Sequence, residues 1–98
     1  MTDAAIPRQP RRKLEVLVLF RRANAPARRV EILDISETGF LIESPIEMSV
    51  GERVWLHLPG LQSMPAKVAR VDGLKTGCSF DQSIHGAVLR SKLQELTN

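Results

Sequence analysis

Short segments of alternating apolar and polar residues run through most of this sequence, and turn-forming residues end each of them. Alternation with a period of two is typical of strands that bury one face and expose the other. The segments lie at residues 14–20, 28–35, 40–43, 53–58, 66–71 and 76–80. Turn signals between them include Pro59-Gly60 and Asp72-Gly73. The chain is therefore predicted to be mainly β.

The pattern changes after Asp81, where apolar residues recur at helical spacing. We expect an amphipathic C-terminal helix over about residues 84–96, with Asp81 or Ser83 as its N-cap. Six short antiparallel strands expose sheet edges unless the sheet closes, and a helix can cover the opening that remains. The predicted fold is a six-stranded antiparallel β-barrel with a C-terminal helix.

The length of 98 residues suits one compact domain with a modest core. Residues 1–12 contain Pro7 and Pro10 and few apolar side chains, so we expect a flexible arginine-rich arm there. Residues 13–98 are expected to form the single domain. The arm contributes to a local excess of cations before residue 30, which attracts phosphates, acidic proteins or anionic membranes.

Several function classes are disfavoured by the residues present. His57 and His85 have no evident nucleophile and orienting acid beside them, so we expect no enzyme. One cysteine and two distant histidines show no metal-ligand spacing, and Cys78 in an alternating segment is expected to be a buried thiol. No signal peptide or membrane-spanning run is evident, so the expected location is the cytoplasm.

Two polar stretches are the candidate binding residues. The first is Arg8-Gln9-Pro10-Arg11-Arg12 in the arm, and the second is Asp34-Ile35-Ser36-Glu37-Thr38-Gly39, between two predicted strands. Arginine binds phosphate oxygens in a bidentate manner and stacks on nucleobases. A carboxylate can accept hydrogen bonds from the N1–H and exocyclic amine of guanine. Ser and Gly in the second stretch also have a structural explanation, because both are common in turns, where Gly can adopt a positive φ.

In their order and spacing, these two stretches resemble the motifs of the PilZ family, Arg-x-x-x-Arg followed by Asp/Asn-x-Ser-x-x-Gly. The order of the strands and the terminal helix also look like a small stand-alone member of that family. The resemblance implies a PilZ-like split barrel that binds cyclic di-GMP, a bacterial second messenger. It implies that Arg8 and Arg12 grip the phosphates and stack on guanine. Arg11 is an additional candidate contact.

The resemblance further implies that Asp34 and Ser36 contact the ligand and that Gly39 shapes the turn. Two positions depart from the family pattern. Members often carry a second arginine directly before the first of the pair, where this chain has Pro7. Many also carry a tryptophan in the fifth strand that packs on the ligand, where this chain has Arg70, whose guanidinium could stack instead or simply be solvated.

The expected function is that of a receptor and adaptor. Clustered arginines repel one another, and cyclic di-GMP would offset that repulsion, order the arm and change the surface offered to a separate protein partner. Two alternatives stay open. One is a PilZ-like module that binds only protein, and the other is a β-barrel that binds nucleic acid through its basic arm, although the chain has few aromatic residues for base stacking.

Overall fold

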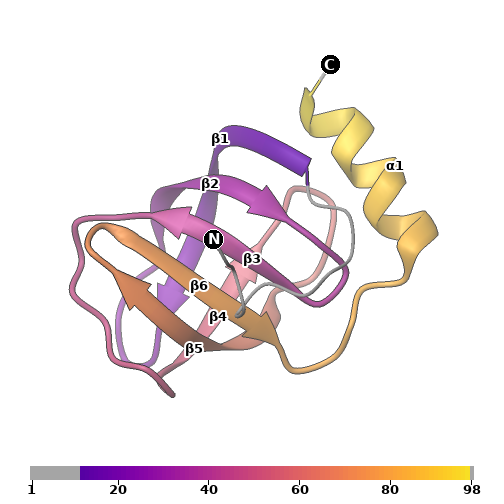
Figure 1. The fold of residues 1–98 in the computed structure, drawn as a ribbon. Helices are drawn as coiled ribbons and strands as arrows, with labels where there is room; N and C mark the ends of the chain where they lie inside the picture. Colours follow the sequence, from indigo (N-terminus) through magenta and orange to yellow (C-terminus); the bar gives the residue numbers. More distant parts are fainter. Residues whose placement is uncertain (1–11, 98) are drawn as a thin grey trace.

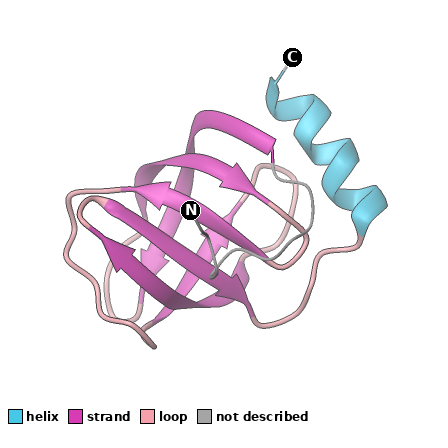
Figure 2. Ribbon diagram, viewed as in Figure 1, coloured by secondary structure: helices cyan, strands magenta, loops and turns pink. Residues whose placement is uncertain are grey.

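The fold consists of six strands and one C-terminal helix (Figures 1 and 2). The computed structural model describes residues 12–97, and the side chains of residues 16–96. All strand pairs are antiparallel and close into a barrel in the order β1-β2-β3-β6-β5-β4, which confirms the predicted fold class. The elements are β1 (Arg12–Arg22), β2 (Arg28–Ile35), β3 (Gly39–Glu43), β4 (Arg53–His57), β5 (Met64–Asp72), β6 (Lys75–Phe80) and α1 (Gly86–Thr97).

Two strand pairs between residues distant in sequence close the barrel. β1–β3 and β4–β6 are two three-stranded meanders, which β3–β6 pairing joins on one side and β1–β4 pairing joins on the other. The β1–β4 seam ends at an ion pair in which Arg22 Nε lies 2.5 Å from Glu52 Oε2. The hydrogen bond from Arg22 lowers the pKa of Glu52, whose other carboxylate oxygen accepts the Ser49 N–H at 3.1 Å. Closure removes the exposed edges that an open sheet would present.

The barrel interior is filled by the apolar half of each alternating segment, as the period of two predicts. The ring of Phe40 lies at its centre, 6.5 Å from the Phe20 ring and 5.2 Å from the Phe80 ring between centroids. Aliphatic side chains of β1 to β5 surround these rings, among them the fully buried Ile32 and Leu56. The chain has three phenylalanines, and all three pack together in one cluster inside the barrel.

The observed element ends differ from the expected ones where backbone pairing or capping intervenes. The helix begins at Gly86, and His85 caps it, since its Nδ1 accepts the Ala87 N–H at 3.1 Å. The predicted caps Asp81 and Ser83 are therefore wrong. Asp81 instead forms an ion pair with Arg53, and it lies in the connection that precedes the helix.

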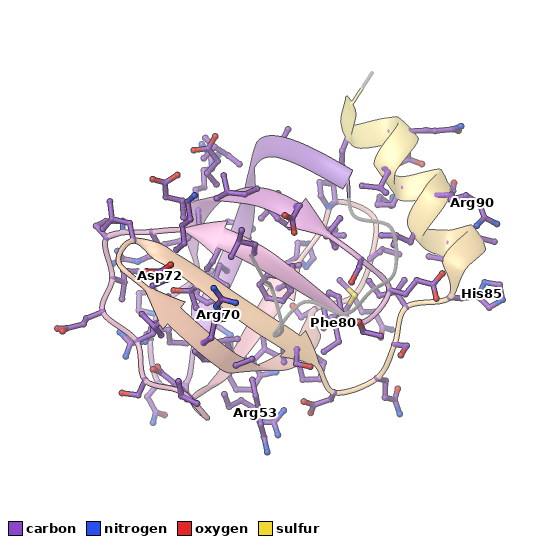
Figure 3. The ribbon with its side chains drawn as sticks, viewed as in Figure 1. Arg53, Arg70, Asp72, Phe80, His85 and Arg90 are labelled. Carbon is purple, nitrogen blue, oxygen red and sulfur yellow. The ribbon has the colours of Figure 1, made fainter. Side chains whose placement is uncertain are left out.

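Helix α1 lies at one end of the barrel, beside the first residues of β1 (Figure 1). Its apolar stripe includes the buried Leu89 and Leu93, and Ile84 before the helix extends the same contact. His85 and Arg90 project away from the barrel at the N-terminal end of the helix (Figure 3). In the described part of the chain, residues 12–97, no helix is long and apolar enough to span a membrane.

Gly39 allows β3 to approach β6 closely. A Cβ atom at this position would overlap the backbone carbonyl oxygen of Cys78, its neighbour across the β3–β6 ladder. Because the obstacle is backbone within a paired strand, it cannot rotate away as the end of a side chain could. Glycine is therefore required at position 39 by the spacing of the two strands.

Cys78 is a fully buried thiol on the inner face of β6, as predicted. Burial raises the pKa of Cys78 to about 12, and the negative charge of Glu52 contributes a smaller part. A thiol reacts as the thiolate, so both the inaccessibility and the raised pKa suppress its chemistry. The residue has a packing role.

We expect Gly39→Ala to destabilise the protein by about 1–3 kcal/mol, because the added methyl group forces β3 and β6 apart. Urea denaturation followed by circular dichroism measures this change. Gly73→Asn is a suitable control, because nothing lies within 4 Å of a Cβ at Gly73 and Asn tolerates its positive φ of 62°. Equal stability of Gly39→Ala and the wild type would contradict the steric argument.

The native thiol of Cys78 should resist a thiol-specific reagent at pH 8 and react fully once the protein is unfolded. Because the folded-state pKa is raised from 9.0 to about 12, the unfolded state releases the proton first and stability should fall as the pH rises from 9 towards 12. Cys78→Ala, compared with the wild type over that range, should lose this part of the pH dependence. Rapid labelling of the native protein at pH 8 would show that the site opens.

Candidate functional site

The corner between β2 and β3, residues 36–39, is held by its own backbone and by Ser36. The Ser36 N–H donates to the Gly39 carbonyl at 2.8 Å, and the Thr38 N–H donates to Ser36 Oγ at 3.3 Å. Ser36 is fully buried, and its hydroxyl also lies 3.4 Å from the Gly39 carbonyl oxygen. These contacts give Ser36 a clear structural role in the turn, whereas its contact with a ligand stays a prediction.

Gly39 shapes the corner for a different reason from the expected one. The glycines with positive φ are Gly51, Gly60 and Gly73, so the left-handed conformation considered for Gly39 was wrong. Its lack of a side chain serves the close approach to Cys78 described above. The serine and the glycine thus fix where the ends of β2 and β3 lie.

Asp34 lies on the outer face of β2, because its neighbour Ile35 points into the core. A β-bulge at Leu33 precedes it, since Ile32 pairs with Ile42 whereas Asp34 pairs with Leu41. Bulges of this kind change the direction of a side chain and are frequent beside binding sites. Asp34 is nevertheless only 8% exposed, so its carboxylate sits in a sheltered part of the outer surface.

The first strand brings the end of the predicted arm to Asp34. The backbone of Arg12 pairs with Ile35 and that of Lys13 pairs with Asp34. The strand therefore begins at Arg12, two positions before the predicted Leu14, so Arg12 belongs to the sheet. Arg8 and Arg11 lie outside the described residues, as does the rest of the arm.

One row of directly paired residues crosses the outer face of the barrel. It runs from Lys13 through Asp34, Leu41 and Gly77 to Arg70, across β1, β2, β3, β6 and β5. The ladder is irregular next to this row in three places: between Lys13 and Val16 and between Ile32 and Asp34 on one side of the row, and between Val68 and Arg70 on the other side. The strands that carry Asp34 and Arg70 are therefore both irregular directly before these residues.

Arg70 is exposed on the outer face of the β5–β6 hairpin (Figure 3). Between it and Asp34 lie the half-buried Leu41 and the bare backbone of Gly77. The row therefore contains a carboxylate, an apolar side chain, a buried glycine and a guanidinium, in that order.

Sequence reasoning did not identify Leu41 and Gly77 as part of this surface. Alternation within β3 and β6 places both on the outer side, because Phe40, Ile42 and Cys78 point inward. Only the pairing of β3 with β6, strands distant in sequence, puts them between Asp34 and Arg70. The sequence analysis did not establish that β3 pairs with β6, and this pairing is what places the two residues.

The remaining chemically reactive residues do not form a second centre. His57 lies on the outer face of β4 and His85 precedes α1. Within residues 12–97, no group of three or more His, Cys, Asp or Glu residues could hold a metal ion.

The corner is also connected to the helix through the backbone. The Phe80 N–H donates to the Thr38 carbonyl at 2.9 Å, and the Ile84 N–H donates to the Glu37 carbonyl at 2.8 Å. The carboxylate of Glu37 lies beside Gly86, the first residue of α1. A displacement of residues 36–39 would therefore be felt at the start of the helix.

Comparison with known proteins agrees with this architecture. The PilZ domain family matches residues 7–98, which include both candidate motifs, the whole barrel and the helix. No curated protein matches the sequence significantly. PilZ domains are a family of binding and adaptor modules associated with cyclic di-GMP. Because the match covers nearly the whole chain, this protein belongs to the PilZ domain family.

Proposed function

We propose that this protein is a receptor for cyclic di-GMP that binds the dinucleotide on the row from Lys13 to Arg70 and acts on a separate protein, without catalysing a reaction. The observation that carries the proposal is the row itself. Backbone pairing sets Lys13, Asp34 and Arg70 in one row, which supports a binding surface that joins the motif carboxylate to the end of the arm. Family membership supplies the ligand class.

Asp34 reads the guanine base. Its carboxylate is directed outward but is sheltered from bulk water, being only 8% exposed, so water competes weakly for its hydrogen bonds. Guanine presents two adjacent donors, N1–H and the exocyclic amine, which match the two carboxylate oxygens. Adenine does not present that pair of donors on the same edge, so Asp34 selects guanine.

The base is supported by three further residues of the row, which are Leu41, Gly77 and Arg70. The half-buried Leu41 gives an apolar contact, and Gly77 beside it adds no side chain between Leu41 and Arg70. Arg70 then stacks its guanidinium on a ring face, the role that an aromatic residue plays in many members of the family. The departure at this position therefore preserves a flat, polarisable partner.

Arg8, Arg11 and Arg12 neutralise the two phosphates. Arg12 pairs with Ile35, which anchors the end of the arm beside the base site. Arg8 precedes it by four positions, a reach of at most about 14 Å along an extended chain, so both side chains can meet one dinucleotide. Pro7 replaces a further arginine, so we expect fewer phosphate contacts than in members that have both.

Binding changes the surface because it fixes the arm against the barrel. Ser36 and Gly39 hold the corner in the shape that receives the ligand, and the corner is bonded to the connection that leads into α1. Ligand contacts at Asp34 thus act on the arm and on the start of the helix together. The result is a ligand-dependent surface for a protein partner.

Asp34→Ala should weaken cyclic di-GMP binding by at least about tenfold, because it removes a charged acceptor of two hydrogen bonds. Arg12→Ala should weaken it similarly. Isothermal titration calorimetry measures both, with Asp72→Ala and Arg28→Ala as controls that remove an exposed carboxylate and an exposed arginine elsewhere on the barrel. No heat with the wild type at high micromolar ligand would contradict the proposal and favour a module that binds only protein.

Arg70→Ala should weaken binding about two- to fivefold, the range for an exposed cation–π or stacking contact, whereas Arg70→Trp should restore or exceed wild-type affinity. Arg70→Lys keeps the charge but loses the flat surface, so it separates stacking from simple attraction. The same titrations give all three values. If lysine preserves the affinity and tryptophan abolishes it, Arg70 acts only through its charge.

A further inference from the structure

A second exposed surface lies on β1 and β4, away from the middle of the nucleotide row. The row begins at Lys13 in β1, but its central residues Leu41 and Gly77 lie at the β3–β6 seam, which is across the barrel from the β1–β4 seam. Leu19, which pairs with His57 on this seam, is 40% exposed, and Leu17, two residues earlier on the same face of β1, is 64% exposed. Two neighbouring exposed leucines on a strand face point to a contact with another molecule.

The leucines border a hollow with a preorganised aromatic wall. A cavity of about 180 Å³ is lined by residues that include Leu19, Trp55 and His57. Arg21 covers the ring of Trp55 at 4.0 Å from its centroid, because the two residues are direct partners in the β1–β4 ladder. Tryptophan and arginine are the residues most enriched at the energetic centres of protein interfaces, and a stacked pair loses little freedom on binding.

The charge around the hollow is predominantly positive. Leu19 is flanked across the ladder by His57 and Arg29, and Arg28 is exposed at the neighbouring end of β2. Glu31, opposite Leu17, is the carboxylate on this part of β2. A second copy of the chain placed here by twofold symmetry would oppose arginines with arginines. The charges therefore favour an acidic partner over self-association.

We propose that the outer face of the β1–β4 seam is the docking surface for an acidic segment of a partner protein. The segment would insert one aliphatic or aromatic side chain into the hollow beside Trp55, and its carboxylates would meet Arg21 and Arg29. Ser63 lines both this hollow and a larger groove of about 630 Å³ beside the start of α1, so the segment can continue along the barrel. This assignment rests on the adaptor part of the proposed function, and peptide binding at this surface can be tested without nucleotide.

The test is a selection of displayed random peptides on the full chain without nucleotide. The enriched peptides should combine acidic residues with a bulky apolar residue, and synthetic copies should change the fluorescence of Trp55, the single tryptophan of the protein. Leu19→Ser and Arg29→Glu should each weaken their binding about tenfold or more. Leu74→Ser, which alters a leucine 55% exposed on the β5–β6 turn, should leave it unchanged.

Three results would overturn the assignment. They are the absence of any enriched peptide, enrichment without acidic residues, and binding that survives both substitutions on the seam. A fourth result would also overturn it. If sedimentation equilibrium shows that the wild type self-associates and Leu19→Ser does not, the surface binds a second copy of the chain. Cyclic di-GMP titrations of Leu19→Ser should match the wild type, so failure of peptide binding and failure of nucleotide binding are distinguishable.

Discussion

The pairing of β3 with β6 is the constraint on which the rest of the structure depends. The two strands are distant in sequence, and their pairing joins the β1–β3 meander to the β4–β6 meander. The pairing requires glycine at position 39, because a Cβ atom there would overlap the backbone carbonyl oxygen of Cys78. The same pairing sets Leu41 opposite Gly77 and so brings Asp34 and Arg70 into one row. Stability and the candidate binding surface thus have one physical origin.

The β2–β3 corner links that surface to the rest of the chain. Ser36 accepts a hydrogen bond within the turn, whereas the Thr38 carbonyl accepts from Phe80 at the end of β6 and the Glu37 carbonyl accepts from Ile84 before α1. The helix contributes buried leucines to one end of the barrel. The proposed coupling of ligand binding to a partner surface depends on the hydrogen bond between the corner and the segment before the helix.

The local features of the fold could be predicted from the sequence because strand alternation and turn chemistry act over a few residues. The β2 bounds and the Asp72-Gly73 turn are examples, since Gly73 has the positive φ that the hairpin needs. The helix cap was wrong because Arg53, distant in sequence, engages Asp81. Leu41 and Gly77 were missed for a related reason, since they become neighbours of the motif residues only through the order of strands.

The most direct test of the central claim is a backbone amide NMR titration of the isotope-labelled protein with cyclic di-GMP. The amides of residues 8, 9, 11–13, 34–39, 41, 70 and 77 should shift together, with one apparent affinity, because they belong to one proposed surface. The Leu17, Leu19 and Trp55 amides, on the outer face of β1 and β4, should change little. Saturable shifts confined to that face, or no shifts at high micromolar ligand, would contradict the assignment of the nucleotide site.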